Sequence, residues 1–377
     1  MADRQVDSRL RERRRRLSFN PDVAIIGGGI VGCAAAAFLA EAGARVELFE
    51  QAELAGAASG RNSGVLQHPF DPVLAGLYEE TLRHVHSLDG LDLAAAPAGL
   101  LMLGRRDEVE PLVAEIRHDC PELRPELVDP SVLRELEPAL GHGLWGCRLE
   151  TGHPLRPAAI TLGFAGRARR LGARLREGAA AWPWIAADRV QGVLAEGRRR
   201  HADAVLVAAG PWTPEVIDPT RDWRPIGPVW GVVVEAELGR PPVHVLEQAG
   251  VKAVGAGMAT PVFSAVTAGK ITSIGSTFLL EEPDPSAWAP TLLAGATGFL
   301  PELDGAAVGG RVRACARPQS FDGRPLIGPY PGVDGLWCAA GHGPWGISTG
   351  AASGRLVTDA MLHGGGIPPP LAVTRSA

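Results

Sequence analysis

The start of the chain carries apolar runs in the order strand, helix, strand. Residues 23–26 are apolar and β-branched, residues 33–42 are rich in helix-forming residues, and residues 46–50 form a strand-like run that ends in an acid. Glycines fill the turn before the helix, at residues 27–29. This pattern predicts a β-α-β unit within a parallel sheet.

Later patterns predict a return to the same sheet and a separate β-rich layer. A helix over 158–171, a hairpin near 189–194 and a buried strand over 204–210 indicate a second Rossmann-like portion. Candidate strands between residues 219 and 310 predict a separate layer. A strand and a helix within residues 336–362 complete the pattern.

Between the two Rossmann-like portions, residues 71–145 form a mixed region. Helices are expected over 77–88 and 108–116, and proline clusters are expected to separate the pieces. A further helix is expected near residues 288–298.

The glycine turn carries the fingerprint of a dinucleotide site. Gly27 permits the tight turn, Gly29 lets the backbone approach a pyrophosphate, and Gly32 lets the helix pack closely on the sheet. Glu50, 23 residues after Gly27, would bind the ribose hydroxyls and repel a ribose phosphate, so FAD or NAD is favoured over NADP. The predicted contacts of this unit are Gly27, Gly29, Ile30, Val31, Gly32, Glu50 and Gln51.

A membrane span is the alternative interpretation of the same segment. Val23 to Ala40 contains no charged residue over 18 positions, about the length that a bilayer needs. Three successive glycines and an acid-tipped second strand argue against a span, and no comparable apolar run occurs elsewhere.

Composition is that of an ordinary globular enzyme. The chain has 377 residues, of which 46% are hydrophobic and 21% charged, and its 48 Gly and 32 Pro predict many turns. The net charge is −5, but residues 1–20 hold seven Arg and three acids, so this end is +4 and the remainder −9. No apolar segment separates it from the first strand, so residues 1–19 are predicted to be a basic flexible tail rather than a secretory signal or a nucleic-acid-binding arm.

The cysteines suggest neither a disulfide framework nor a metal site. They are five in number, widely spaced, and include no Cys-x-x-Cys pair. A reducing cytoplasm fits this usage, and we predict no bound metal. The positions are Cys33, Cys120, Cys147, Cys315 and Cys338.

Four blocks in the same order resemble the FAD-dependent D-amino-acid oxidase family, which includes glycine oxidase, sarcosine oxidase and D-amino-acid dehydrogenases. The blocks are residues 27–50, 58–64, 208–213, and 317–328 with 341–346. The resemblance runs through nearly the whole chain and implies FAD as cofactor. It implies an α/β fold with a Rossmann-like FAD-binding domain and a β-rich substrate domain, the arrangement of glutathione-reductase-type two-domain flavoproteins.

The order of patterns and blocks predicts how the chain is divided. Residues 20–90, 146–216 and 311–377 are assigned to a discontinuous FAD-binding domain. Residues 91–145 and 217–310 are assigned to the substrate domain.

The resemblance implies further FAD contacts. The segment after the ribose strand would pass along the pyrophosphate, unless it is a polar surface loop. A helix starting near Gly346 would aim its unpaired N–H groups at the flavin, where reduced flavin carries negative charge, unless the glycines only cap a connection. The implied positions are Ser59, Arg61, Asn62, Ser63, Gly64, Val65, Ala181, Ala209, Gly210, Trp212, Gly343, Gly346, Ile347 and Ser348.

Arg317 occupies the place where the family presents an arginine that clamps the substrate carboxylate. The alternative is a structural pair with nearby Asp322. His68 and His342 are the other candidate catalytic residues, and each could instead satisfy local hydrogen bonds. Gln67 could likewise point into the substrate space.

Several positions depart from relatives within the family. Pro344 replaces a second arginine of glycine oxidase, and Ser273 stands near the place of the oxygen-activating lysine of sarcosine oxidase, with Lys270 close by. Cys315 matches the cysteine that sarcosine oxidase joins to its flavin, although a buried free cysteine is the more ordinary interpretation. Candidate pocket walls are Trp230 and Trp345, with core packing equally open for Trp230.

The resemblance implies FAD-dependent oxidation of a small amino acid or N-alkyl amino acid by hydride transfer to flavin N5, giving an imine that is then hydrolysed. A 2-hydroxy-acid dehydrogenase stays open, since residues 61–65 also resemble the flavin loop of L-2-hydroxyglutarate dehydrogenases. A flavin-carrying subunit of an electron-transferring complex is a third possibility. The expected partners are an amino acid or amine substrate and O2 or another electron acceptor, with no nucleic acid, no membrane span and an oligomer possible.

Overall fold

The computed structural model describes most of the chain. The described residues are 22–91, 93–220, 222–250, 261–304 and 310–375. The predicted basic tail, residues 1–19, lies outside them.

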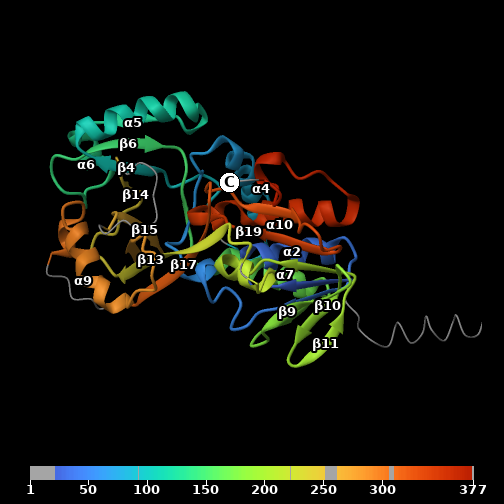
Figure 1. The fold of residues 1–377 in the computed structure, drawn as a ribbon. Helices are drawn as coiled ribbons and strands as arrows, with labels where there is room; N and C mark the ends of the chain where they lie inside the picture. Colours follow the sequence, from blue (N-terminus) through green and yellow to red (C-terminus); the bar gives the residue numbers. More distant parts are fainter. Residues whose placement is uncertain (1–21, 92, 221, 251–260, 305–309, 376–377) are drawn as a thin grey trace, which may run out of the picture.

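A six-stranded sheet contains the predicted β-α-β unit (Figure 1). Its strand order is β18-β19-β12-β1-β2-β8, and β1 pairs in parallel with both β2 and β12. The strands are β1 (Val23–Ile26), β2 (Val46–Phe49), β8 (Arg174–Arg176), β12 (Ala204–Val207), β18 (Leu326–Pro329) and β19 (Leu336–Ala340). The α/β fold class predicted from the sequence is confirmed.

Helices enclose the helix of the β-α-β unit. α2 (Ile30–Glu41) packs against α7 (Ala159–Arg170) and α10 (Gly346–His363), and α10 also packs against α4 (Pro72–His86). Residues 30–40 are all buried. Residues 30–40 therefore carry no charge because protein surrounds them on all sides, and the charged Glu41 lies at the exposed end of α2. Among the described residues, no helix has the length and apolar character to cross a membrane.

An eight-stranded sheet forms the second layer, beside the first (Figure 1). Its order is β17-β13-β16-β15-β14-β4-β6-β5. The strands are β4 (Leu100–Gly104), β5 (Glu126–Val128), β6 (Trp145–Leu149), β13 (Ile226–Ala236), β14 (Val245–Gln248), β15 (Ser264–Ala268), β16 (Ile271–Gly275) and β17 (Val312–Ser320). α5 (Arg106–Asp119) and α6 (Pro130–Leu136) pack at the β6 side, and α9 (Pro285–Ala296) packs on β13, β16 and β17.

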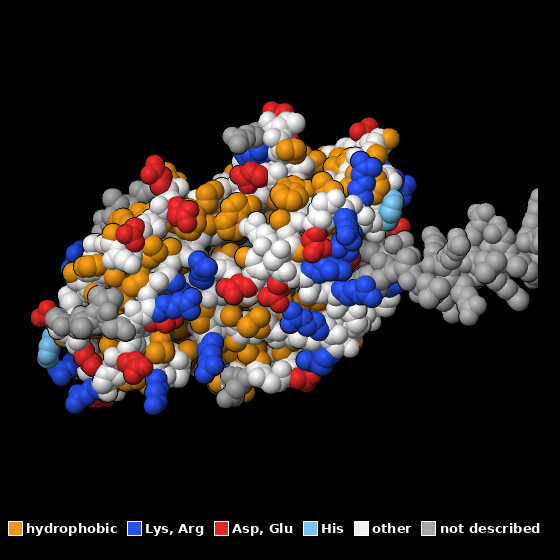
Figure 2. Space-filling model, turned by 90° about the horizontal axis from the view of Figure 1, so that it is seen from below, with side chains coloured by type: hydrophobic (Ala, Val, Ile, Leu, Met, Phe, Trp, Pro, Cys, Tyr) orange, Lys and Arg blue, Asp and Glu red, His pale blue; other side chains and the backbone are white. Residues whose placement is uncertain are grey.

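The remaining elements are short. A three-stranded sheet contains β9 (Ala181–Ala186), β10 (Arg189–Ala195) and β11 (Arg198–His201), and β3 (Val65–Leu66) pairs with β7 (His153–Pro154). α3 (Ala58–Arg61) and α8 (Thr213–Ile217) complete the α-helices among the described residues. On the face drawn in Figure 2, basic and acidic side chains are interspersed among apolar ones.

Two helices begin earlier than the sequence pattern predicted. α4 begins at Pro72 rather than near Leu77, and α9 begins at Pro285 rather than near Trp288. In each case the preceding aspartate accepts main-chain N–H bonds as the N-cap. Proline in the first turn lacks only an N–H that would be unpaired there. The Asp-Pro pairs therefore start these helices instead of separating elements.

The division into domains stays a prediction, but two strands lie in a different sheet from the one it implies. The predicted ranges 146–216 and 311–377 place β17 and most of β6 in the FAD-binding domain. Both strands pair within the eight-stranded sheet, β17 with β13 and β6 with β4 and β5. The boundaries differ because hydrogen-bonded ladders, rather than the sequence blocks, decide to which sheet a strand belongs.

Candidate functional site

The glycine turn closes tightly on the six-stranded sheet. Gly27 has a φ of +114°, and a Cβ added there would lie 2.3 Å from the carbonyl oxygen of Ala208. A Cβ added at Gly32 would lie 2.0 Å from the carbonyl oxygen of Gly27. Neither position accommodates a side chain without moving the backbone. The structure thus has the tight turn and the close helix packing that the fingerprint predicts.

Two helix N-termini meet beside this turn. A Cβ added at Gly350, near the start of α10, would lie 2.8 Å from the side chain of Ile30, the first residue of α2. Ser59 Oγ accepts the N–H of Ile30 at 3.0 Å, whereas the N–H groups of Val31 and Gly32 cannot bond within the helix. The positive ends of two helices therefore converge, which favours an anionic ligand.

The carboxylate of Glu50 lies beside the glycine turn. Its Oε2 accepts the N–H of Gly28 at 2.7 Å, and its Oε1 accepts the N–H of Ala52 at 2.9 Å. Each oxygen keeps further acceptor capacity, which suits a hydroxyl donor such as a ribose. Gln51, also a predicted contact, is exposed.

Asn62 shapes the segment that follows β2, residues 58–68, which we call the cofactor loop. Its Nδ2 donates to the carbonyl oxygens of Ala58 and Ser59 at 3.1 and 3.0 Å, and its Oδ1 accepts the N–H of Gly64 at 2.8 Å. Gly64 has a φ of +84°, and a Cβ added there would lie 2.4 Å from the carbonyl oxygen of Leu155. The loop is thus internally fixed. Its predicted FAD contacts stay predictions and are Ser59, Arg61, Asn62, Ser63, Gly64 and Val65.

Arg313 on β17, which the sequence patterns did not single out, fastens this loop to the eight-stranded sheet. Its guanidinium donates to the carbonyl oxygens of Arg61 and Asn62 at 3.2 and 2.9 Å. It also donates to Ser273 Oγ at 2.9 Å and pairs with Glu235. The side chain is buried. One residue therefore joins the predicted cofactor loop to the second sheet.

Replacement of Arg313 by alanine is expected to lower the free energy of unfolding by about 2–4 kcal/mol. The loss follows because two loop carbonyls and Glu235 would lose their partner. Chemical denaturation measures it. Arg45→Ala is the control, because it removes only an exposed pair with Asp22 that is worth about 1 kcal/mol or less. Equal losses in the two variants would contradict an anchoring role for Arg313.

Arg317 lies four residues further along β17 and is only partly buried. Its Nη1 donates to the carbonyl oxygen of Thr277 at 2.9 Å and its Nη2 to Ser276 Oγ at 2.5 Å. The guanidinium lies 4.4 Å from the centre of the Phe278 ring and directly over Gly231, where an added Cβ would be 2.4 Å from Nη2. Burial lowers its pKa. Within the described part of the chain, no carboxylate pairs with Arg317.

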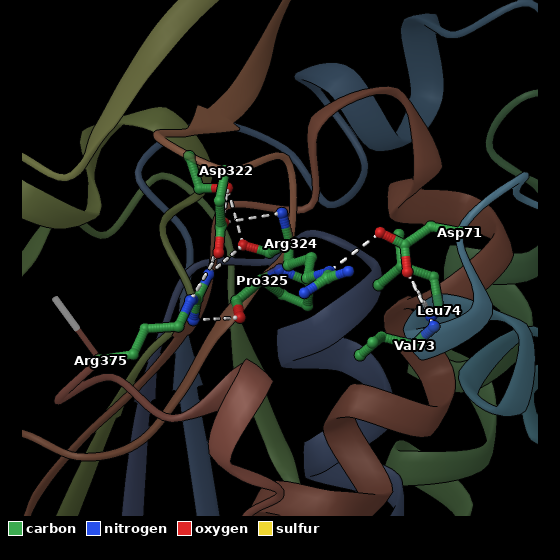
Figure 3. Close-up of polar contacts among 8 residues, drawn as sticks. Asp71, Val73, Leu74, Asp322, Arg324, Pro325 and Arg375 are labelled. Carbon is green, nitrogen blue, oxygen red and sulfur yellow. Dashed lines mark hydrogen bonds and ion pairs between the residues drawn. The ribbon is translucent and has the colours of Figure 1, made fainter. Parts of the chain in front are cut away.

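Asp322, the predicted structural alternative, is bound elsewhere (Figure 3). Its carboxylate accepts Nε and Nη2 of Arg375 at 2.9 and 2.8 Å, and the N–H of Arg324 at 3.0 Å. Arg324 in turn donates through Nε to Asp71, the N-cap of α4, at 2.9 Å. The carboxylate of Asp322 therefore neutralises Arg375. The alternative prediction, a structural pair between Arg317 and Asp322, is wrong.

Strand register decides which face of the sheet carries Arg317. Arg313, Cys315 and Arg317 alternate along β17 and so lie on one face, the face from which Arg313 reaches the cofactor loop. Trp230 pairs with Ala316 and packs in the hydrophobic core on the opposite face. Core packing is thus its role, and the prediction that Trp230 walls the substrate space is not supported.

The two positions considered for an oxygen-activating lysine differ in their surroundings. Ser273 lies on β16, where its hydroxyl accepts a bond from Arg313. Lys270 is exposed in the turn between β15 and β16. Cys315 is buried and free, and burial raises the pKa of its thiol.

The start of α10 is tied to the predicted substrate side of the cofactor loop. Ser348 Oγ accepts the N–H of Gln67 at 3.1 Å. Trp345, just before α10, meets the Phe70 ring edge-on with centroids 6.1 Å apart. The remaining predicted FAD contacts stay predictions; they are Ala181 at the start of β9, Ala209 and Gly210 after β12, the part-exposed Trp212, and Gly343, Gly346, Ile347 and Ser348 around the start of α10.

His342 is buried in the connection between β19 and α10. Its Nε2 lies 2.9 Å from Ser353 Oγ on α10. Burial lowers the pKa of His342 to about 4, so the ring is neutral near pH 7. The hydrogen bond fits the local role considered for this residue, and its catalytic role stays a prediction.

The pH dependence of stability is expected to report the burial of His342. Between its unfolded pKa of 6.5 and about pH 4 the unfolded chain binds a proton that the folded chain does not, so acid destabilises the fold. From pH 7 to 4.5 this residue contributes about 2–3 kcal/mol of that loss. The free energy of unfolding of His342→Gln, measured at pH 7 and at pH 4.5, should fall by correspondingly less than that of the wild-type protein. The control variant His118→Gln, at an exposed position, should lose as much as the wild-type protein. A wild-type difference in His342→Gln would contradict the prediction.

His68 lies beside two other potential metal ligands. Its ring meets that of Tyr78 edge-on with centroids 5.2 Å apart, and its Nε2 lies 3.4 Å from a carboxylate oxygen of Glu122. Ligand atoms of His68, Cys120 and Glu122 lie within 4.8 Å of one another. More than fifty residues separate His68 from the other two, so sequence spacing gave no sign of this grouping. The absence of a metal stays a prediction, as does a catalytic role for His68.

Comparison with known proteins decides the family. The model of the family described as DAO, FAD dependent oxidoreductase, matches residues 22–360. The chain belongs to the DAO family of FAD-dependent oxidoreductases. It is 28% identical to glycine oxidase from Pseudomonas aeruginosa over 358 residues, 90% of this chain and 94% of that protein. It is 30% identical to hydrogen cyanide synthase subunit HcnC from the same species over 307 residues, 76% of this chain and 68% of that protein.

Solved structures of the DAO family share the fold. The structure of glycine oxidase from Bacillus cereus matches with a TM-score of 0.77 at 24% identity, covering 90% of this chain and 94% of that one. The family match shows that the protein is an FAD-dependent oxidoreductase.

The residues described above fit the FAD that the DAO family carries. Gly29 is partly exposed, and a Cβ added there would meet only Ser59 Oγ, at 3.1 Å, so a pyrophosphate can approach this backbone, on which two helix N-termini converge. Glu50 offers acceptors for a ribose, and the start of α10 offers unpaired N–H groups for the flavin ring.

Proposed function

We propose that this protein oxidises a small amino acid or N-alkyl amino acid at a C–N bond, giving an imine that water hydrolyses. The observation that carries the proposal is the guanidinium of Arg317. It lies on the sheet face that meets the cofactor loop, it remains partly accessible, and no carboxylate of the described residues neutralises it. A substrate carboxylate supplies the counter-ion that the fold leaves out.

The contacts of Arg317 suit it to fixing the orientation of a substrate. Ser276 and Thr277 hold one side of the guanidinium, so its other N–H donors are directed in a plane that matches a carboxylate. Fixing the carboxylate also fixes the neighbouring C–N bond. FAD, when bound, supplies the chemistry by accepting a hydride at flavin N5. His342 is neutral, and its Nε2 is hydrogen-bonded to Ser353. It is not needed as a base when the substrate amine is itself neutral.

An electron acceptor other than O2 is part of the proposal. Ser273 stands near the place of the lysine that activates oxygen in sarcosine oxidase, and Lys270 lies in an exposed turn. The positive charge nearest Ser273 belongs to Arg313, which Glu235 compensates. Slow reaction with oxygen, as in a dehydrogenase, is expected because the described residues place no uncompensated cation beside Ser273.

The test is the visible absorption spectrum of the purified protein under anaerobic conditions. Glycine, sarcosine, D-alanine, D-proline and 2-hydroxyglutarate are added in turn. Bleaching of the flavin band by an amine supports the proposal, and the rate of recovery on admitting air measures reaction with oxygen. Bleaching by 2-hydroxyglutarate alone would favour the hydroxy-acid alternative. A bound flavin that no substrate reduces would favour an electron-transferring subunit.

A further inference from the structure

A second charged side chain, Glu247, faces the same region as Arg317 from the other half of the sheet. Glu247 lies on β14 and pairs with β15. Residues paired across antiparallel strands share a face, so the register can be followed from β14 to β17. That path runs from Glu247 through Ser264, Gly275 and Val233 to Arg313. Glu247 therefore shares its face with Arg313 and Arg317.

Glu247 also lies next to the cofactor loop. Gln67 Nε2 donates to its Oε1 at 3.0 Å, and the backbone N–H of Gln67 bonds Ser348 at the start of α10. The carboxyl group is thus placed between the eight-stranded sheet and the predicted flavin position. Burial raises the pKa of Glu247, and the bond from Gln67 lowers it.

Gln67 and Glu247 lack some of the hydrogen-bond and ion-pair partners that their polar groups could take. Gln67 Oε1 is buried without a hydrogen-bond partner among the described residues. Within the same residues no arginine, lysine or histidine forms an ion pair with Glu247. The half-buried carboxylate of Glu247 and the buried amide oxygen of Gln67 are both acceptors, and among the described residues neither has a cation as partner.

The separation from Arg317 indicates which part of a substrate could reach this pair. Arg317 starts four strands from β14, but its guanidinium bonds Ser276 and Thr277, which directly follow β16. About two inter-strand steps, roughly 10 Å at about 4.8 Å per step, therefore separate the guanidinium from β14. An amino acid of the size of glycine, held through its carboxylate by Arg317, is too short to approach Glu247. A long side chain extends its tip toward β14.

We propose that Glu247, held by Gln67, is a specificity-determining residue that binds the positively charged end of an amino-acid side chain. The inference rests on the proposed function and narrows its substrate to amino acids with a basic side chain. Arg317 binds the carboxylate, Glu247 binds the remote cation, and the C–N bond to be oxidised lies between them.

The experiment compares lysine with norleucine, which has the same carbon chain without the terminal ammonium. Both enantiomers are used with the flavin-loaded enzyme, and kcat/KM is measured anaerobically by flavin reduction. Wild-type enzyme is expected to prefer lysine by at least 10-fold, and Glu247→Gln should lower this lysine-to-norleucine ratio by at least 10-fold. Glu126→Gln, an exposed acid on the edge strand β5 of the same sheet, is the matched control and should keep the wild-type ratio.

Binding is measured in parallel, so that failure of the inference and failure of the proposed function are distinguishable. The change in flavin absorbance on titration reports affinity even where no oxidation occurs. Tighter binding of lysine that is lost in Glu247→Gln, without bleaching, upholds the inference about Glu247 and contradicts the proposed oxidation. Equal wild-type binding and kcat/KM for lysine and norleucine, or a ratio unchanged by Glu247→Gln, overturns the inference whether or not amino acids are oxidised.

Discussion

Replacing Arg317 by alanine is expected to lower kcat/KM for carboxylate substrates roughly 100-fold, mainly through a higher KM, while the flavin stays bound. Loss of a charge-assisted carboxylate pair in a partly buried site costs about 3 kcal/mol, which corresponds to that factor. Flavin retention follows because Arg317 contacts Ser276 and Thr277 of its own sheet, whereas Arg313 holds the cofactor loop. Steady-state kinetics and the flavin-to-protein absorbance ratio measure the two effects separately.

Two further variants sharpen the interpretation of Arg317→Ala. Arg317→Lys keeps the charge but loses the planar pair of donors, so it should recover only part of the lost kcat/KM. Arg311→Ala changes an exposed residue just before β17 and should behave as the wild-type enzyme. Wild-type kinetics in Arg317→Ala would remove this residue from the substrate site.

Replacing Gly32 by alanine is expected to abolish FAD binding and to cost at least about 3 kcal/mol of stability. The added Cβ would lie 2.0 Å from the carbonyl oxygen of Gly27, so α2 has to move away from the glycine turn. Because α2 contacts α7, α10 and β2, the displacement cannot stay local. The flavin content of the purified protein and its thermal midpoint are the measurements.

Two other glycine-to-alanine changes separate cofactor binding from folding. Gly29→Ala adds a Cβ 3.1 Å from Ser59 Oγ at an ordinary negative φ, so the fold should survive while the backbone loses its close approach to the pyrophosphate. Gly76→Ala lies within α4, where nothing lies within 4 Å of the added atom, and should stabilise the protein by up to about 1 kcal/mol. Full flavin content in Gly32→Ala would show that the close packing at this position is dispensable.

Features encoded locally in the sequence could be predicted from it. The glycine turn, the helix after it and the acid at the end of the second strand form one continuous stretch, so spacing alone gave the β-α-β unit. The order of further patterns gave the strand β12 and the helix α10. The starts of α4 and α9 were missed because Asp-Pro both interrupts a pattern and caps a helix.

Features that depend on strand register could not be predicted. Arg313 and Arg317 lie on one face of β17, but only the pairing with β13 shows that Trp230 lies on the other. Glu247 reaches this face through three further strand pairs, and its contact with Gln67 joins residues 180 positions apart. The partner of Asp322 is Arg375, 53 residues along the chain. Such contacts follow from the tertiary fold, which a single sequence pattern does not specify.

The placement of these residues on separate strands bears on how the enzyme can diverge. β17 carries both Arg313, which anchors the cofactor loop, and Arg317, the proposed carboxylate ligand. Substitutions on this strand can therefore impair flavin retention and catalysis together. β14 contributes Glu247 from four strands away, and among the described residues its side-chain hydrogen bond to the loop is the one from Gln67. Duplicated copies of this gene would therefore acquire new substrates most readily through changes on β14, and a saturation library confined to that strand should yield more active variants than one of equal size on β17.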